Sequence, residues 1–450
     1  MAFKEYDVFI IGTGTAGKNV AKACVEAGLK VGIADNREYG GTCANVGCDP
    51  KKVLLGITEI LEKAEKLLGK GVTKLPEVSW EDTMAWKETF VDAVPAATEK
   101  DLKKLGIDLY HQSPKFLDKN TLSVEGKTIT ADKIVIATGQ VPMELKIPGR
   151  SHALISDDFL NLEKLPDSMI FIGAGYIGME FAHIAARFGV KVTLMEFLPG
   201  PLVNFDEDMV AHLQKASEEL GIEIVFNAKV NEIEKLQKNF RVKALQNGKE
   251  ISATAAMVFN TAGRVPSIQD LDLENGNVAF SKKGIVVNEF LQSTTNKNVY
   301  ACGDVADSPG LPLTPLSSLE SEVVAHNIIN KKMKRATYPA QPSVVFTLPN
   351  LASVGFSEKE AKAKGYEVTV EHKLVKNWFN AKRINEKVYA YKTIVDNKTG
   401  QIIGIHLVGP EAAEVINLFA LAMNCKTDVN SLKQMLFAYP TWGNDIKGMV

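Results

Sequence analysis

Two cysteines that lie five positions apart are the residues whose type and spacing most directly suggest chemistry. Cys43 and Cys48 stand in the segment GTCANVGCDPKK, before an apolar-periodic stretch that predicts a helix from Val53. A helix N-terminus and the nearby Lys51 and Lys52 lower the pKa of a thiol and favour the nucleophilic thiolate. Cysteines at this spacing can also close a small disulfide ring. The pattern therefore predicts a redox-active pair that precedes the helix.

Other readings of these cysteines are a zinc half-site or two buried thiols. Zinc needs further cysteine or histidine ligands at suitable spacing, and Cys24, Cys302, Cys425 and the seven scattered histidines form no such cluster. We therefore expect no metal site. Cys425 follows Leu418 and Leu421 on an apolar helical face, which predicts a buried thiol.

A glycine-rich turn near the start of the chain indicates a nucleotide site. The apolar run Tyr6–Ile11 predicts a buried parallel strand, and GTGTAG follows at once before a helical pattern. Gly14 lets the backbone approach a pyrophosphate, Gly17 lets helix and strand pack closely, and the helix N-terminus supplies free N–H groups. The next strand, Lys30–Ala34, ends at Asp35, whose carboxylate can accept hydrogen bonds from a ribose diol.

The same βαβ unit recurs in the middle of the chain. Met169–Ile172 predicts a strand, GAGYIG over 173–178 forms the turn, and the strand Lys191–Met195 ends at Glu196. In both units the acidic residue follows the first glycine by 23 positions. One such turn is a weak signal, but two in the same context predict two dinucleotide sites.

The second acidic residue bears on the choice of nicotinamide cofactor. Glu196 would repel a 2′-phosphate, and the four residues after it, FLPG, include no arginine or lysine that could hold one. The sequence therefore favours NADH over NADPH.

Length and composition limit the number of domains and the kinds of partner that the chain can have. At about 150 residues per domain, 450 residues suggest about three packed units. The 52 Lys and Arg nearly cancel the 54 Asp and Glu, which argues against a partner that is a nucleic acid or an anionic membrane surface. No apolar run is long enough for a membrane span, and the amino end lacks a signal-peptide pattern. Together with the sparse cysteines, this predicts a cytoplasmic location.

The segments between and after the βαβ units predict how they are connected. Val53–Lys70 and Glu81–Leu105 have helical patterns, and a strand over Lys133–Ile136 runs into ATG at 137–139. The tail from Val344 contains two predicted strands, a predicted helix and no glycine-rich fingerprint; these elements are Val388–Val395, Ile402–Val408 and Glu411–Asn424.

Across nearly its whole length the chain resembles the class I flavoprotein disulfide oxidoreductase family, the group of dihydrolipoamide dehydrogenase, glutathione reductase and mercuric reductase. The resemblance rests on the two fingerprints and four further motifs: GTCANVGC at 41–48, the redox motif; ATG at 137–139, the domain-closing turn; AGRVP at 262–266, the turn after the nicotinamide site; and CGD at 302–304, the flavin-ribityl motif.

The resemblance implies an α/β fold with two Rossmann-like dinucleotide-binding domains and an α+β dimerisation domain, as in glutathione reductase. It divides the chain into an FAD-binding domain (residues 1–148 and 267–337), an NAD-binding domain (149–266) and a dimerisation domain (338–450). A homodimer with FAD and NADH as cofactors is expected.

Residue roles follow from the same resemblance. Cys48 would face the flavin and Cys43 would react with the acceptor, Tyr176 would gate the nicotinamide pocket, and Glu180 would pair with Lys51 or Lys52. The residues expected to hold FAD are Gly12, Gly14, Gly17, Asp35, Gly41, Thr42, Lys52, Ala137, Thr138, Gly139, Gly303, Asp304 and Thr314. Those expected to hold the nicotinamide cofactor are Gly173, Gly175, Tyr176, Ile177, Gly178, Glu196 and Gly263.

The tail departs from the family pattern. Members that act on organic disulfides carry His-Pro-Thr-x-x-Glu there, and the partner subunit's imidazole shuttles protons to the interchange thiol. Tyr439 and Asn444 replace the histidine and the carboxylate, and Asp445 comes one place too late. A phenol of pKa about 10 is a poor base at neutral pH. The chain also lacks the terminal cysteine pair of mercuric reductases.

A second departure is Asp49, directly after Cys48, because a like charge opposes thiolate formation. We hypothesise that Asp49 raises the pKa of Cys48 unless Lys51 or Lys52 compensates.

The leading interpretation is an enzyme that passes electrons from NADH through FAD to the Cys43–Cys48 disulfide and on to a disulfide-type or other small acceptor. The alternatives are a diaphorase-like reductase, in which a quinone, oxygen or a metal ion accepts the electrons, and a non-catalytic redox-sensing subunit.

Overall fold

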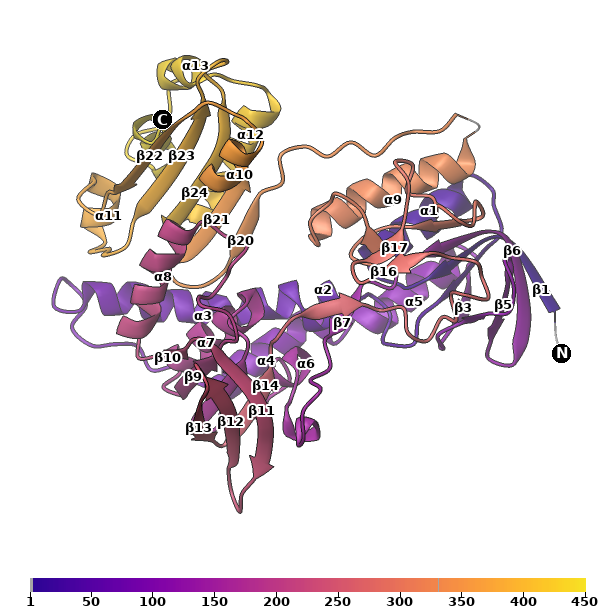
Figure 1. The fold of residues 1–450 in the computed structure, drawn as a ribbon, viewed down its shortest axis with the longest axis horizontal. Coiled ribbons are helices and arrows are strands. Elements are labelled where there is room, and N and C mark those ends of the chain that lie inside the picture. Colours follow the sequence, from indigo (N-terminus) through magenta and orange to yellow (C-terminus); the bar gives the residue numbers. More distant parts are fainter. Residues whose placement is uncertain (1–2, 331) are drawn as a thin grey trace. The chain divides into compact units, whose positions relative to one another are not determined.

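The computed structural model describes residues 3–330 and 332–450. Contacts divide the chain into two compact units, each built from segments that are separate in the sequence (Figure 1). The first unit combines Met1–Lys52, Ala85–Met143 and Arg264–Tyr338, and the second combines Val53–Met84, Glu144–Gly263 and Pro339–Val450.

A largely parallel sheet forms the centre of the first unit. The end of β1 is an apolar run that pairs in parallel with β2 on one side and β6 on the other. The strand order is β3-β2-β1-β6-β5-β4, and β18 also pairs with β6. Its strands are β1 (Phe3–Ile11), β2 (Val31–Ala34), β3 (Asp108–Tyr110), β4 (Lys115–Phe116), β5 (Thr121–Val124), β6 (Lys127–Ile136) and β18 (Val299–Ala301).

Two helices cover one face of this sheet because β1 alternates its apolar side chains. Val8 and Ile10 pack with α1 and α9, which lie side by side in Figure 1, while Phe9 and Ile11 join the core on the other face. The remaining elements of this unit are α1 (Thr15–Glu26), α2 (Thr42–Val46), α5 (Val94–Lys104), β7 (Gln140–Pro142), β15 (Arg264–Pro266), β16 (Phe280–Ser281), β17 (Gly284–Val286), β19 (Ala306–Asp307) and α9 (Thr314–Ile329). Helices α3 (Cys48–Leu67) and α4 (Trp80–Val91) each cross the boundary between the units.

The second unit contains a second parallel sheet, in the order β10-β9-β8-β14, and a three-stranded antiparallel sheet, β11-β12-β13. An aromatic cluster fills the core, in which Phe159 stacks on Phe181 and Phe171 stacks on Phe259. The elements are η1 (Arg150–His152), α6 (Ser156–Phe159), β8 (Ser168–Ile172), α7 (Tyr176–Arg187), β9 (Lys191–Met195), α8 (Glu207–Glu219), β10 (Glu223–Val225), β11 (Ala228–Lys235), β12 (Phe240–Gln246), β13 (Lys249–Ala255) and β14 (Met257–Asn260).

The carboxyl-terminal segment of this unit forms a five-stranded antiparallel sheet, β20-β21-β24-β23-β22, with α12 packed on it. Every residue of β24 except one is buried, so this strand forms the centre of the sheet. The elements are β20 (Ser343–Val345), β21 (Asn350–Gly355), α10 (Glu358–Ala363), β22 (Val368–Leu374), α11 (Phe379–Arg383), β23 (Ala390–Asp396), β24 (Ile402–Gly409), α12 (Ala412–Asn424), α13 (Val429–Gln434), α14 (Trp442–Asp445) and η2 (Ile446–Gly448).

The expected fold class is confirmed, with two corrections to its details. The helix predicted from Val53 begins at Cys48, so Cys48 is its first residue and does not precede it. Cys425 is exposed and not buried, because the helical face that it follows is open to solvent at Leu421, which is 61% exposed. The division of the chain into FAD-binding, NAD-binding and dimerisation segments stays a prediction.

A buried lysine joins α8 to the five-stranded sheet. Lys392 on β23 is 4% exposed, and its ammonium lies 3.0 Å from Asp206, 2.8 Å from Asp208 and 3.3 Å from Glu358. Asp206 also accepts backbone N–H bonds at the start of α8. This buried cation therefore lies against three carboxylates, of which Glu358 also pairs with Lys362 at 2.6 Å.

Replacement of Lys392 tests how much this residue stabilises the packing of α8 on the five-stranded sheet. Lys392→Ala leaves the buried Asp206 carboxylate without its cation, whereas Glu358 keeps Lys362 at 2.6 Å, and we expect a loss of about 3–5 kcal/mol in stability. The measurement is the apparent melting temperature together with the urea midpoint. Lys398→Ala removes an exposed lysine from the same region as a control, and equal stability losses in the two variants would contradict this account.

Candidate active site

The predicted cysteine pair lies at the junction of two helices in the first unit. Cys43 is in the short helix α2, Cys48 is the first residue of α3, and the two sulfur atoms are hydrogen-bonded to each other. Gly47 makes the sharp link between the helices, where an added Cβ would lie 2.7 Å from the carbonyl oxygen of Thr42. The Thr314 hydroxyl, at the start of α9, donates to Cys43 Sγ at 3.3 Å and lies 3.9 Å from Cys48 Sγ.

The two thiols have opposite electrostatic character. The hydrogen bond from Cys43 lowers the pKa of Cys48 to about 6, with help from Lys51 and Thr314 and against the effect of burial. The same hydrogen bond, together with burial, raises the pKa of Cys43 far above its usual value. The proton of the pair therefore resides on Cys43, and Cys48 is the thiolate near neutral pH.

Asp49 acts on this pair in the direction that the sequence suggested. Its carboxylate raises the pKa of Cys48, but the hydrogen bond and Lys51 outweigh it. Asp49 also raises the pKa of Cys43. Thiolate formation at Cys48 thus depends on compensation of a fixed negative charge.

The first glycine-rich turn has the geometry of a nucleotide cradle. Gly12 has φ +109°, and an added Cβ would lie 2.3 Å from the carbonyl oxygen of Ala137. At Gly17 an added Cβ would lie 1.9 Å from the oxygen of Gly12, so strand and helix need glycine at both places. Asp35 Oδ2 accepts from Thr13 N and Thr13 Oγ1, both at 2.7 Å, which fixes the carboxylate beside the turn.

The second turn repeats this geometry in the second unit. Gly173 has φ +105° and abuts Thr261 and Ala262, while an added Cβ at Gly178 would lie 2.2 Å from the oxygen of Gly173. Glu196 is buried and accepts from Ala174 N at 2.6 Å and from Leu198 N at 2.8 Å. The fixed acidic residue is thus common to both turns.

The other residues expected around FAD also gather in the first unit. The Thr138 hydroxyl oxygen is buried and makes no hydrogen bond within the described residues, as expected for a side chain that meets a ligand. Gly303 N donates to Glu320 at 2.7 Å, and burial raises the pKa of Asp304 while Arg264 opposes that rise. Gly139, Thr42 and Lys52 lie in the neighbouring turns and in α2 and α3. These groups fit the polar and anionic segments of a dinucleotide.

The residues expected around the nicotinamide lie in different elements of the second unit. Tyr176 is the exposed first residue of α7, and Ile177 after it is half-buried. Glu180 is 2% exposed and accepts from Phe346 N at 2.8 Å. Gly263 is exposed and has φ +132°, which favours glycine. The predicted pairing of Glu180 with Lys51 or Lys52 stays a prediction.

The altered tail motif lies in the second unit. Tyr439 is 74% exposed, and its ring lies 6.4 Å from that of Phe379. Thr441 accepts from Asn444 N at 3.2 Å and so caps α14. Asp445 accepts from Asn380 and from the Tyr389 hydroxyl, each at 3.2 Å. Asp445 therefore does not take the place of the missing orienting carboxylate.

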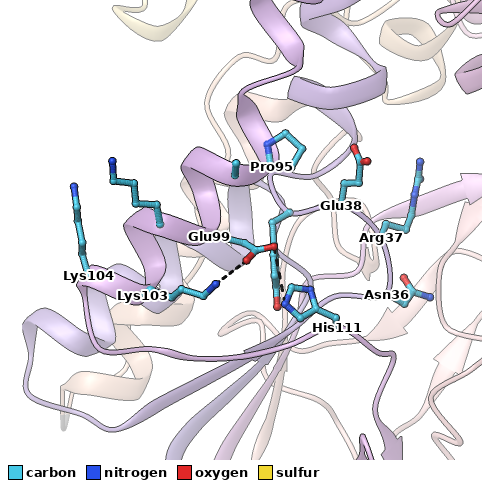
Figure 2. Close-up of a pocket in the computed structure, with 11 residues that line it drawn as sticks. Asn36, Arg37, Glu38, Pro95, Glu99, Lys103, Lys104 and His111 are labelled. Carbon is cyan, nitrogen blue, oxygen red and sulfur yellow. Dashed lines mark hydrogen bonds and ion pairs between the residues drawn. The ribbon is translucent and has the colours of Figure 1, made fainter.

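A cavity of about 1140 Å³ adjoins the residues after Asp35. Figure 2 shows it between the end of β2 and helix α5, with Glu99 bonded to Lys103 and facing His111. Arg37 and Lys100 also line it, so basic side chains outnumber acidic ones. The cavity offers space next to the carboxylate expected to bind a ribose.

Several functional groups were not identified from the sequence. The expected role of Thr314 at the flavin stays a prediction; what the sequence did not indicate is the contact of its hydroxyl with the Cys43 sulfur. Glu320 supports the Gly303 turn, and Lys18 lies near Cys43 and Asp49. Only Lys18 had a local signal, since it directly follows the last glycine of the first fingerprint.

Two kinds of feature are missing from the described ranges, 3–330 and 332–450. No helix there is both long and apolar enough to cross a bilayer. In that same portion of the chain, no three histidine, cysteine or acidic residues are grouped as a metal site requires.

Comparison with known proteins agrees with this arrangement. The family model described as pyridine nucleotide-disulphide oxidoreductase matches residues 6–327, and the model of its dimerisation domain matches residues 341–450. The solved structure of the HOCl-induced flavoprotein disulfide reductase RclA from Escherichia coli is similar, with a TM-score of 0.87, 27% identity and 99% of each chain covered.

Curated relatives span several activities. A mercuric reductase of Lysinibacillus sphaericus is 32% identical over 98% of this chain and 82% of its own length. A glutathione reductase of Nostoc sp. is 32% identical, covering 93% and 94% of the two chains. A dihydrolipoyl dehydrogenase of Geobacillus stearothermophilus is 30% identical, covering 98% and 94%. With its paired cysteines, its two fingerprints and these matches, the chain belongs to the class I flavoprotein disulfide oxidoreductase family and is an oxidoreductase.

Proposed function

We propose that this protein passes electrons from NADH, with FAD as cofactor, to the Cys43–Cys48 pair and then to a disulfide-type or other small acceptor. The observation that carries the proposal is the geometry of the pair: Cys43 in α2, which accepts from the Thr314 hydroxyl, is hydrogen-bonded to Cys48 at the start of α3, and this bond favours ionisation of Cys48 over Cys43. This asymmetry gives the two thiols different roles.

The FAD role is supported by the fit of the first unit. The turn at Gly12–Gly17, the fixed Asp35 carboxylate and the buried Thr138 hydroxyl are suited to the pyrophosphate, the ribose and a further polar group. When bound, FAD supplies hydride acceptance and electron transfer. The residues of this chain bind and orient it, and they tune the neighbouring thiols.

Reduction of an acceptor disulfide would then proceed on the two cysteines. Cys43 passes its proton along its hydrogen bond to the Cys48 thiolate and attacks one sulfur of the acceptor, and the other acceptor sulfur leaves as a thiolate that takes up this proton from Cys48. Cys48 next attacks the Cys43 sulfur in the mixed disulfide and releases the second thiol, which restores the internal disulfide. Two electrons have then passed from the dithiol to the acceptor.

The altered tail limits the choice of acceptor. Because Tyr439 replaces the histidine and Asp445 is bonded elsewhere, proton transfer to large organic disulfides lacks its usual base. We propose that glutathione disulfide and lipoamide are turned over slowly and that the physiological acceptor needs little base catalysis. The dimerisation domain supports a homodimer.

Removal of the reactive thiol tests the route. Cys43→Ser should lower NADH-dependent disulfide reduction by at least about 10³-fold, because the nucleophile is lost. The measurement is steady-state turnover with low-molecular-weight disulfides, and the exposed Cys425→Ser serves as the matched control. Unchanged turnover in Cys43→Ser would favour direct transfer from flavin to a quinone or oxygen.

Removal of the Asp49 charge tests whether this carboxylate raises the pKa of Cys48. Asp49→Asn should lower the pH midpoint at which the Cys48 thiolate forms by about half a unit, because a neighbouring negative charge raises a thiol pKa. The midpoint is read from the long-wavelength absorption of a thiolate beside bound flavin. A midpoint equal to that of the parent protein would show that Asp49 has no influence.

The preference for NADH over NADPH tests the role of Glu196 at the second glycine-rich turn. We expect NADH to bind at least about ten-fold more tightly than NADPH, because the fixed Glu196 carboxylate repels a 2′-phosphate. Glu196→Gln removes the negative charge and should reduce the difference between the dissociation constants of NADH and NADPH. Dissociation constants from fluorescence titration check this, and tighter binding of NADPH to the parent protein would refute it.

A further inference from the structure

The first turn of α1 lies directly against the redox segment. Gly41 has φ +82°, and an added Cβ would lie 2.4 Å from the Cα of Gly14, so these two glycines are in close contact. Lys18 follows one helical turn later, with its backbone N–H bonded to the Gly14 oxygen at 3.0 Å. The chain thus brings a lysine side chain to the same end of α1 as the segment that carries Cys43.

A second helix bounds the pair from another side. Helix α9 packs along α1, and the Thr314 hydroxyl at its start donates to Cys43. The first turns of the two helices are held together through Gly303, whose added Cβ would lie 3.0 Å from Ser317 and 3.4 Å from Ala16. The half-buried Cys43 is therefore bounded by the first turns of α1 and α9, whereas Cys48 is exposed.

Lys18 is a cation near Cys43 and Asp49, and it lies outside the redox motif. Its side chain is half-buried; burial lowers its pKa, and the Cys43 sulfur and the Asp49 carboxylate act to raise it. Lys51 acts on Cys48 instead. Helix α9 contributes only the Thr314 hydroxyl to the pair, and the Glu99 and Lys103 side chains of α5 line the cavity of Figure 2.

We propose that Lys18 is a positioning residue whose ammonium group offsets Asp49 and stabilises the ionised dithiol on its Cys43 side. Cys43 must carry negative charge when it attacks an acceptor, and the tail supplies no histidine to stabilise it. Lys18 provides the compensating charge from the same chain. The inference rests on the proposed function for its purpose, but the charge effect can be measured without NADH.

Alkylation of the dithiol tests this role. FAD-loaded protein is reduced anaerobically with excess dithiothreitol, desalted and treated with iodoacetamide from about pH 5 to about pH 9, and modification of Cys43 is followed by peptide mass spectrometry. Because the two thiols share a proton through their hydrogen bond, the rate follows the first ionisation of the pair. In Lys18→Gln the pH of half-maximal rate should rise by about 0.5–1 unit, because a cation near the pair favours this ionisation. Lys18→Arg keeps the charge and should retain the parent midpoint.

The matched control is Lys22→Gln, one turn further along α1, where the lysine side chain is 65% exposed and lies 3.9 Å from Glu26. This variant should leave the midpoint unchanged. Lys18→Gln combined with Asp49→Asn should return the midpoint toward the parent value, because both opposing charges are then absent.

An unchanged midpoint in Lys18→Gln would overturn the proposal, as would an equal rise in Lys22→Gln or in Lys18→Arg. FAD content and circular dichroism establish that each variant is folded, and Lys18→Met is a second neutral replacement. Because dithiothreitol forms the dithiol, a failure of NADH to reduce the protein would remove the proposed function and leave this measurement intact.

Discussion

The close contact of Gly14 with Gly41 is the constraint on which the rest of the candidate site depends. It holds the start of the redox segment against the first turn of α1, and α1 begins at the turn whose geometry suits a pyrophosphate. A side chain at position 41 would force the two segments apart. The distance between a bound cofactor and the thiols is thus set by backbone atoms, which vary little with side-chain motion.

The two glycine-rich turns have the same local geometry. In each, the first glycine has a positive φ, the last packs against it, and an acidic residue from the next strand accepts a backbone N–H of the turn. The turns differ in the additional contacts of that acidic residue. Asp35 also receives the Thr13 hydroxyl, whereas Glu196 is bound only by backbone groups in the hydrogen bonds described.

Sequence reasoning located these turns because every feature that defines them is local. The order strand, glycines, helix and acidic residue is visible within each βαβ unit, and the structure has the elements where the pattern predicts them. The start of α3 also had a local signal that was missed: Asp49 and Pro50 suit the first turn of a helix.

What could not be predicted depends on contacts between distant segments. Thr314 reaches Cys43 across 271 positions, and Lys18 comes near Cys43 and Asp49 because two glycines approach each other. No periodicity encodes such meetings. Cys425 was misplaced for a different reason: the end of α12 was predicted correctly, but Leu421, which marked the apolar face, is 61% exposed, so an apolar residue there does not indicate a buried face.

The hydrogen bonds of Asp445 have a consequence for any attempt to restore the family's tail motif in this chain. Because Asn380 and Tyr389 hold that carboxylate in the packing of the carboxyl-terminal sheet, it is not available to be recruited by a neighbour. Grafting an imidazole at position 439 alone would leave the ring without an acidic partner. Restoring the family's pair of residues would therefore need a glutamate at position 444 together with a histidine at position 439.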